Sequence, residues 1–224
     1  MTHGNYKSAR FRAPLLSIGS RQTLICESMN WSTDPRWKVR RRRSELRRRP
    51  WLEVFEEHVE LPDGRLIDDF YTVEMQDFVV VVALTPTGEV VVESLYRHGP
   101  GRVTWSLPAG FLHAGRDPVE SAILELREET GYEAESWTLL GRFVVDGNRG
   151  CGWCNCLLAR DAKRVSEPRS DDLAEAQVAL LPWDRMLHLL FAGDMVELAS
   201  AAAFGLAAIR LGTAGSINPA HANG

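Results

Sequence analysis

The chain has 224 residues, of which 45% are hydrophobic and 25% are charged, and its formal net charge at pH 7 is −4. This composition is typical of a globular protein large enough to bury a hydrophobic core. No stretch approaches the roughly 18 consecutive apolar residues of a membrane-spanning helix, which excludes an integral membrane protein built from such helices.

Four cysteines occur, and three of them fall within six positions. Because a chain of this length does not need a disulfide framework, we expect a reducing compartment, the cytoplasm. Cys151, Cys154 and Cys156 resemble half of a zinc site, but no second Cys or His pair lies at ligand spacing. Cys154 and Cys156 alternate like residues on one face of a strand, which favours small buried apolar residues over metal ligands.

Residues 1–48 show no clear periodicity, and we interpret them as a disordered basic tail. The first 26 residues contain four basic and no acidic residues, which is typical of an organelle transit peptide, and a translation start at Met29 is the alternative. Arginines crowd positions 36–49, with Glu45 as the one acidic residue among them. A solvated basic segment is favoured over nucleic-acid binding, because no aromatic platform interleaves the run.

Extended segments begin at Trp51. Residues 52–61 and 65–73 flank a Pro-Asp-Gly turn and predict a hairpin, so we assign 49–75 to an amino-terminal strand segment. A main domain is expected over 76–212, followed by a flexible tail at 213–224. Its β-branched or apolar runs predict strands, and its last two apolar segments predict helices. The strands are expected at 78–84, 89–96, 103–107, 137–145, 153–159 and 177–181, and the late helices at 183–191 and 196–211.

The best-specified element lies between Asp117 and Gly131. Asp117 is suited to cap a helix, Pro118 fits its first position, Glu120 completes a capping box, and Gly131 ends it. A loop formed by Pro108-Ala109-Gly110 precedes it. The order of strands, one helix, further strands and two helices predicts an α+β sandwich without βαβ alternation.

Three glutamates of this helix are spaced i, i+3 and i+4, which places Glu125, Glu128 and Glu129 on one face. Like charges at this spacing destabilise a helix, so a compensating divalent cation is expected. Oxygen ligands on a rigid element suit Mg²⁺ or Mn²⁺. A solvated acidic helix face is the competing interpretation.

The segment from Gly110 to Tyr132 resembles the Nudix signature, in which Gly, five residues and Glu are followed after seven residues by Arg-Glu-apolar-any-Glu-Glu-any-Gly-apolar. Two positions depart from it: Arg116 stands in place of the first Glu, and Leu124 in place of Arg. The positions that match at full spacing are Gly110, Glu125, Leu126, Glu128, Glu129, Gly131 and Tyr132.

This resemblance implies an α/β/α sandwich with a mixed sheet and an amino-terminal β-hairpin segment. It also implies that Glu125, Glu129 and the Ala109 carbonyl bind the metal, with Glu128 as a third ligand or the catalytic base. The lost Arg and Glu help to hold loop and helix together in the family. Arg127, one turn beyond Leu124, is a hypothetical replacement for the missing cation.

Further motifs are similar to those of the ADP-ribose pyrophosphatase branch, although 146–149 lacks a proline common there. The branch places its Tyr-Arg segment near the substrate, which makes Arg97 a substrate-binding candidate, and it implies a catalytic role for Glu175. It also implies a homodimer with crossing amino-terminal strands. The motifs are Leu-Pro-Asp-Gly-Arg at 61–65, Tyr-Arg-His at 96–98, Leu-Pro-Ala-Gly-Phe at 107–111 and Leu-Leu-Pro-Trp-Asp at 180–184.

The expected activity is Mg²⁺-dependent hydrolysis of the pyrophosphate bond in a nucleoside diphosphate derivative, with ADP-ribose or a related nucleotide sugar as the small-molecule substrate. Two alternatives remain. Loss of the two signature residues is compatible with a weakly active or inactive nucleotide sensor, although a pure binder has no need of three repelling carboxylates. RNA binding through the arginine run is the other alternative.

Overall fold

A computed structural model describes residues 34–112, 115–169 and 176–212. The chain divides at Trp37, and the architecture given below is that of the unit beginning there. Its first strands are β1 (Lys38–Arg48), β2 (Leu52–Glu60), β3 (Leu66–Met75), β4 (Phe78–Leu84), β5 (Val90–Arg97), β6 (Arg102–Ser106) and β7 (Ala109–Phe111). Its later strands are β8 (Tyr132–Glu133), β9 (Ser136–Asp146), β10 (Gly150–Arg160), β11 (Lys163–Arg164) and β12 (Gln177–Leu181). Its helical elements are α1 (Pro118–Glu125), η2 (Leu126–Thr130), α2 (Trp183–Ala192) and α3 (Leu198–Arg210).

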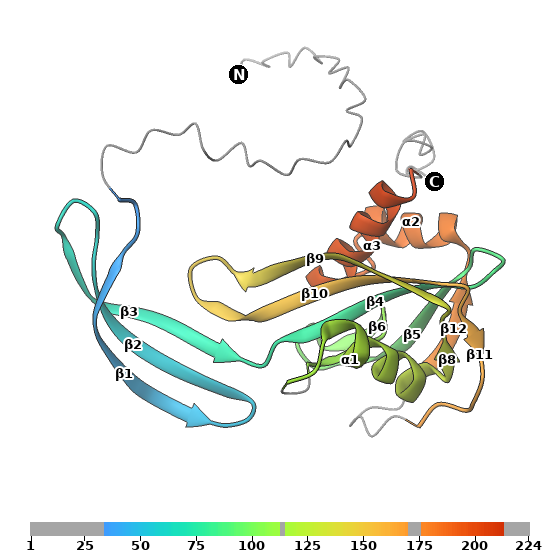
Figure 1. Ribbon diagram of the computed structural model, residues 1–224, viewed down its shortest axis with the longest axis horizontal. Coiled ribbons are helices and arrows are strands. Elements are labelled where there is room, and N and C mark those ends of the chain that lie inside the picture. The colour runs from blue at the N-terminus through green and yellow to red at the C-terminus, as the bar shows by residue number, and fades with distance from the viewer. Residues whose placement is uncertain (1–33, 113–114, 170–175, 213–224) are drawn as a thin grey trace, which may run out of the picture. The chain divides into compact units, whose positions relative to one another are not determined.

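The main sheet is mixed, as the sequence analysis expects. Its strands run in the order β1-β2-β3-β10-β4-β5-β12, with β6 paired to β5, β7 to β4 and β9 to β10. Strand β10 is parallel to β3 and β4 but antiparallel to β9 (Figure 1). The amino-terminal strands therefore join the rest of the sheet through β3 and β10. Three short strands, β7, β8 and β11, were not expected from the sequence, which predicts a loop at β7.

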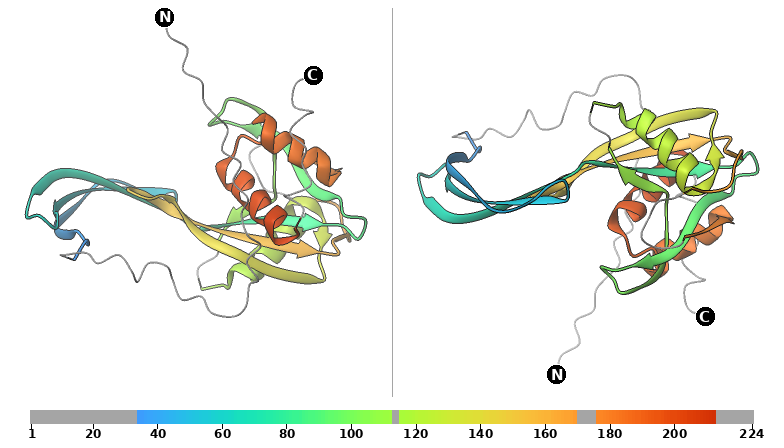
Figure 2. Two further views of the ribbon diagram at one scale, coloured as in Figure 1. Left: turned by 90° about the horizontal axis from the view of Figure 1, so that it is seen from above. Right: turned by 90° about the horizontal axis from the view of Figure 1, so that it is seen from below.

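Helices cover both faces of the central strands, so the unit is an α/β/α sandwich. Consecutive valines of β4 point to opposite sides: Val79 and Val81 pack with Ala122 and Leu126 of α1 and η2, whereas Val80 packs with α2 and α3. All three valines are at most 1% exposed. Figure 2 shows α1 on one side of the strands and α2 and α3 on the other. Burial on both faces explains why β4 is a continuous apolar run rather than an alternating one.

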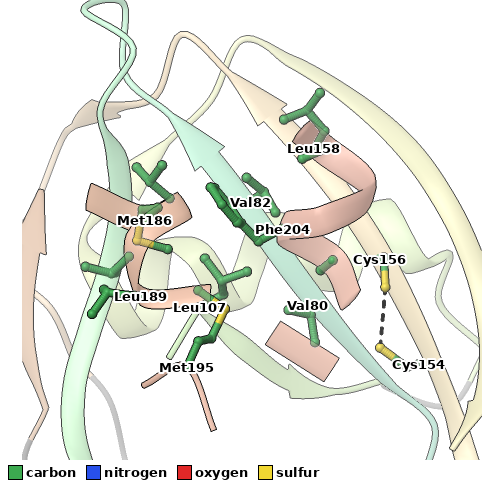
Figure 3. Close-up of a cluster of buried hydrophobic side chains, with 14 residues drawn as sticks. Val80, Val82, Leu107, Cys154, Cys156, Leu158, Met186, Leu189, Met195 and Phe204 are labelled. Carbon is green, nitrogen blue, oxygen red and sulfur yellow. Dashed lines mark hydrogen bonds between the residues drawn. The ribbon is translucent and has the colours of Figure 1, made fainter. Parts of the chain in front are cut away.

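The cysteine pair of β10 belongs to the core beneath α3. Cys154 and Cys156 are 6% and 0% exposed, and their Sγ atoms lie 3.7 Å apart beside Val80 and Phe204 (Figure 3). The contact with Cys156 and burial raise the pKa of the Cys154 thiol. Both side chains are buried among apolar residues of the core, so the interpretation of the pair as buried apolar residues is confirmed.

The helix that carries the glutamates begins at the expected residue and ends differently. The Asp117 carboxylate accepts the Val119 N–H at 2.8 Å, and Pro118 opens α1. Beyond Glu125, however, the backbone widens into the π-helical turn η2 instead of continuing as an α-helix. Gly131 ends it with φ of 75°, and a Cβ there would lie 2.1 Å from the Ser166 carbonyl oxygen. Only glycine fits this position, for both reasons.

The arginine run forms a strand, which corrects the expectation of a disordered tail through residue 48. Residues 38–48 are β1, an edge strand paired antiparallel with β2, so the amino-terminal strand segment begins near Trp37 instead of at residue 49. Sequence periodicity does not reveal this strand because every residue of it is exposed. The arginines of β1 pair with carboxylates that lie opposite them only once the strands are in register.

Those carboxylates come from β2 and β3. Arg42 lies between Glu57, at 3.0 Å, and Glu74, at 2.7 Å, while Arg49 is 2.8 Å from Glu53 and 2.7 Å from Glu74. We call this set of residues the charge ladder; its other ion pairs are Arg40 with Glu60, Arg41 and Arg43 with Glu56, and Arg47 with Glu53. Because these arginines face carboxylates of the same chain, the charge available to a nucleic acid is reduced.

The expectations for residues 1–33 and 213–224, including the transit peptide and the start at Met29, lie outside the described residues. In the part of the chain that the structure describes, no helix is long and apolar enough to cross a membrane.

Candidate active site

A cavity of about 410 Å³ opens where α1, η2, β7 and the start of α3 approach the sheet. It contains three carboxylates, from Glu125, Glu129 and Glu197, and one guanidinium, from Arg97. Its other lining residues are Phe78, Val80, Ala109, Gly110, Phe111 and Ala199. Charges of both signs on an apolar frame suit a ligand that carries phosphates and binds through a cation.

Glu129 is the most buried of these carboxylates. The residue is only 6% exposed, and its Oε2 atom accepts the Ala109 N–H at 2.9 Å. Burying a carboxylate is costly unless hydrogen bonds or a counter-ion compensate for it. The hydrogen bond fastens β7 to η2, so the strand and the helical turn hold each other at the cavity.

Glu125, the last residue of α1, reaches the cavity across Gly110. A Cβ atom built on Gly110 would lie 2.0 Å from the Glu125 carboxyl carbon. No side chain can stand at this position without displacing the carboxylate. The signature begins with a glycine here because the Glu125 carboxylate lies so close to the Gly110 backbone that no Cβ fits between them.

Glu128 stands apart from the other two glutamates of the signature. Its residue is exposed, and it does not line the cavity. The wider turn of η2 changes the angular spacing expected for an α-helix, which separates Glu128 from Glu125 and Glu129. Consistently, no three His, Cys, Asp or Glu side chains gather at metal-binding distance within the described ranges. The sequence-based expectation of one face for all three glutamates therefore does not hold for this geometry.

The residues present fit a hard divalent cation. Glu125, Glu129 and the Ala109 carbonyl offer oxygen atoms only, and Gly110 leaves the space that the Glu125 carboxylate occupies. Mg²⁺ commonly binds through one or two carboxylates and completes its coordination with water and substrate phosphates. A third carboxylate is not required for such a site.

Arg97, at the end of β5, is paired with a residue that the sequence analysis missed. Its Nε atom lies 2.7 Å from Oε1 of Glu197, and each side chain is 28% exposed. The N–H of Nε does not point at this oxygen well enough to form a hydrogen bond, so the contact is an ion pair. Glu197 directly precedes an alanine-rich helix, and this acidic residue at a helix start is the signal that could have revealed it.

The two signature departures lie outside the cavity. Arg116 is exposed and Leu124 is half-buried. Arg127 pairs with Glu133 at 2.9 Å and is itself 58% exposed, so its contact contradicts the hypothesis that it replaces the missing cation. Glu175, the other expected catalytic residue, lies outside the described residues.

An aromatic pair lies at the cavity rim. Phe111, which lines the cavity, is 44% exposed, and its ring centroid is 6.3 Å from that of Trp51. Trp51 is 63% exposed and belongs to the turn between β1 and β2. Exposed aromatic faces beside this cavity are surfaces on which a planar base can stack.

Comparison with known proteins gives two family matches. Residues 75–199 match the NUDIX domain, and residues 37–73 match the nucleoside diphosphate sugar hydrolase N-terminal domain. The second match covers the strands of the charge ladder. The amino-terminal strands and the cavity therefore both belong to recognised domains.

Curated relatives and a solved structure agree with these matches. An ADP-ribose pyrophosphatase of Mycobacterium tuberculosis is 30% identical over 73% of this chain and 78% of its own length. An ADP-ribose pyrophosphatase of Bacillus subtilis is 30% identical over 54% of this chain and 65% of its own. The crystal structure of an ADP compounds hydrolase has the same fold, with a TM-score of 0.70 at 20% identity over 81% of this chain and 97% of its own. Because the NUDIX match spans more than half of this chain, the chain belongs to the Nudix family.

Proposed function

We propose that this protein hydrolyses the pyrophosphate bond of a nucleoside diphosphate derivative, with ADP-ribose or a related nucleoside diphosphate sugar as substrate and Mg²⁺ as the metal. The observation that carries the proposal is the meeting of Glu125 and Glu129 with Arg97 in one cavity. The names of the two curated relatives and of the amino-terminal domain support the substrate class.

Each cavity residue has a distinct role in this proposal. Glu125, Glu129 and the Ala109 carbonyl hold Mg²⁺, which when bound supplies Lewis acidity toward phosphate oxygens and water. Arg97 binds a phosphate through its guanidinium. A water oxygen bonds to one phosphorus, the bridging P–O bond breaks, and a carboxylate takes the proton of the water. For ADP-ribose the products are AMP and ribose 5-phosphate.

Glu128 and Glu175 are the two candidates for that carboxylate. Exposure does not exclude Glu128, because catalytic geometry often tightens only when substrate binds. Substituting each residue by Gln distinguishes them. We expect only the variant of the true base to lose turnover while keeping its Mg²⁺-dependent affinity for substrate.

The test of the proposed function is a panel of nucleoside diphosphate derivatives incubated with Mg²⁺, with Glu129→Gln as the inactive variant and a chelator as a second control. We expect the wild type to release a nucleoside monophosphate, and both controls to suppress it. Equal product from wild type and variant, or none from either, would contradict hydrolysis. Binding without product would instead favour the nucleotide sensor, which the departures at Arg116 and Leu124 make the second candidate.

We also propose a cytoplasmic homodimer. The amino-terminal strand segment is the element expected to cross to the partner, and Tyr71 and Met75 of its strand β3 are exposed in the single chain. Phe143 and Val145, which alternate onto one face of β9, are exposed as well. The three cysteines within the described residues are free, in keeping with a reducing compartment. Light scattering measures the mass, and Phe143→Asp together with Val145→Asp should yield a monomer. A wild-type monomer at micromolar concentration would contradict the dimer.

A further inference from the structure

We infer that Glu197 is a positioning residue, which holds the Arg97 guanidinium in place to receive a phosphate and links it to strand β7, which carries Ala109. This inference rests on the proposed function of the same cavity. Glu197 itself does not contact the substrate, so removing the Glu197 charge weakens diphosphate binding only through Arg97.

The contact between the two residues leaves the phosphate-binding part of Arg97 available. Glu197 approaches the guanidinium at Nε, 2.7 Å from Oε1. The two Nη atoms form the rest of the planar fork, which suits two oxygens of one phosphate. Since both side chains are 28% exposed, water screens their attraction incompletely, and the ion pair can restrict where Arg97 lies.

A role as an ordinary helix cap does not account for the Glu197 side chain. Glu197 occupies the N-cap position of α3, yet its side chain accepts no hydrogen bond from the backbone amides of that helix. One carboxylate oxygen instead faces Arg97, and the other accepts the Ser200 hydroxyl at 3.3 Å. Both oxygens are thus directed to side chains, at the end of the helix that borders the cavity.

Ser200 extends the contact to Leu107, just before strand β7. Its hydroxyl oxygen accepts the N–H of Leu107 at 3.3 Å, and Ser200 itself is only 2% exposed. Leu107 is buried and stands two residues before Ala109, whose N–H binds Glu129. A chain of contacts therefore runs from Arg97 through Glu197 and Ser200 to the residues just before β7, and it joins the phosphate-binding and cation-binding sides of the cavity.

The experiment measures binding, so that it does not depend on turnover. The probe is α,β-methylene ADP, whose P–C–P bridge resists hydrolysis, titrated in Mg²⁺ into wild type, Glu197→Gln, Arg97→Gln and the double variant. Each single variant should raise Kd by about tenfold, the effect of losing one charged contact. The double variant should bind no more weakly than Arg97→Gln alone, because the two residues act as a unit. Ser200→Ala should raise Kd by a smaller factor.

Glu133→Gln is the matched control, since it removes the partner of an exposed arginine outside the cavity. Its Kd should equal that of the wild type, and melting temperatures identify any variant that binds weakly because it is unfolded. Additive effects in the double variant, an unchanged Kd for Glu197→Gln, or no binding by the wild type would each overturn the inference. Coupled binding in a protein that hydrolyses no substrate would leave the inference intact and refute the proposed function alone.

Discussion

Strands β1 and β4 belong to one sheet but are stabilised by opposite chemistry. Between Val79 and Ala83 every residue of β4 is at most 1% exposed, whereas every residue of β1 is exposed. Burial removes apolar surface from water and dominates folding energy, while exposed ion pairs contribute little each. The central strands thus account for most of the stability, and the charge ladder sets the register of an edge that water can reach.

The largest effect is expected in the core beneath α3. Phe204 is fully buried, and its ring centroid lies 4.6 Å from that of Trp183. Phe204→Ala should lower the free energy of unfolding by about 3–5 kcal/mol, through lost burial and the cavity left behind. Urea denaturation followed by circular dichroism measures this value. A loss below about 1 kcal/mol would mean that this layer is not the main source of stability.

The next effect concerns activity instead of stability. Gly110→Ala places a methyl group where the Glu125 carboxylate lies, and displacing a ligand by about 1 Å can lower turnover about 100-fold. The assay is hydrolysis of ADP-ribose in Mg²⁺. Gly147→Ala is the matched control, because a Cβ there meets no atom within 4 Å, and its activity should be normal. Equal activity of the two variants would remove Glu125 from the proposed metal site.

The contrast between β1 and β4 also separates the elements that the sequence predicts from those that it does not. The apolar run of β4 and the cap at Asp117 are local signals, so both elements could be located from the sequence. Strand β1 could not be located from the sequence, because its arginines indicate a strand only when they lie opposite the carboxylates of β2 and β3. Charge pairing across strands depends on register, which a linear pattern does not contain.

The candidate site divides in a similar way. The spacing of the signature locates Glu125 and Glu129, and the structure brings both to the cavity with Arg97. The spacing does not reveal the π-helical turn that separates Glu128 from them, since helical periodicity assumes a constant number of residues per turn. Glu197 was missed because it is a tertiary partner of Arg97, one hundred residues away in the chain.

Acid should loosen the charge ladder before it affects the core. Arg40 lowers the pKa of Glu60, and Arg42 and Arg49 lower that of Glu74, from the ordinary value of 4.5. A lowered pKa in the folded state adds stability that is present above pH 4.5 and is lost as the pH falls through the folded value. Hydrogen exchange, corrected for intrinsic rates, should show β1 losing protection below this pH while β4 keeps it.

High salt at neutral pH provides the control for that experiment. Because salt screens exposed charges, about 1 M NaCl should also raise exchange in β1 without affecting β4. Protection of β1 that persists in both acid and salt would show that backbone pairing with β2 suffices to hold this edge.

The smallest effect is expected from a single residue of the charge ladder. Arg42 contacts Glu57 and Glu74, and its guanidinium carbon lies 3.6 Å from the centroid of the Phe55 ring. Its side chain is nevertheless 39% exposed, so Arg42→Ala should lower the free energy of unfolding by no more than about 1 kcal/mol. Arg43→Ala should cost less still, because the Arg43 side chain is 61% exposed and water screens its contacts with Glu45 and Glu56 more fully. Urea denaturation of both variants beside Phe204→Ala tests the ranking. If Arg42→Ala cost as much as the core variant, the charge ladder would be a principal source of stability, and the contrast between β1 and β4 would be wrong.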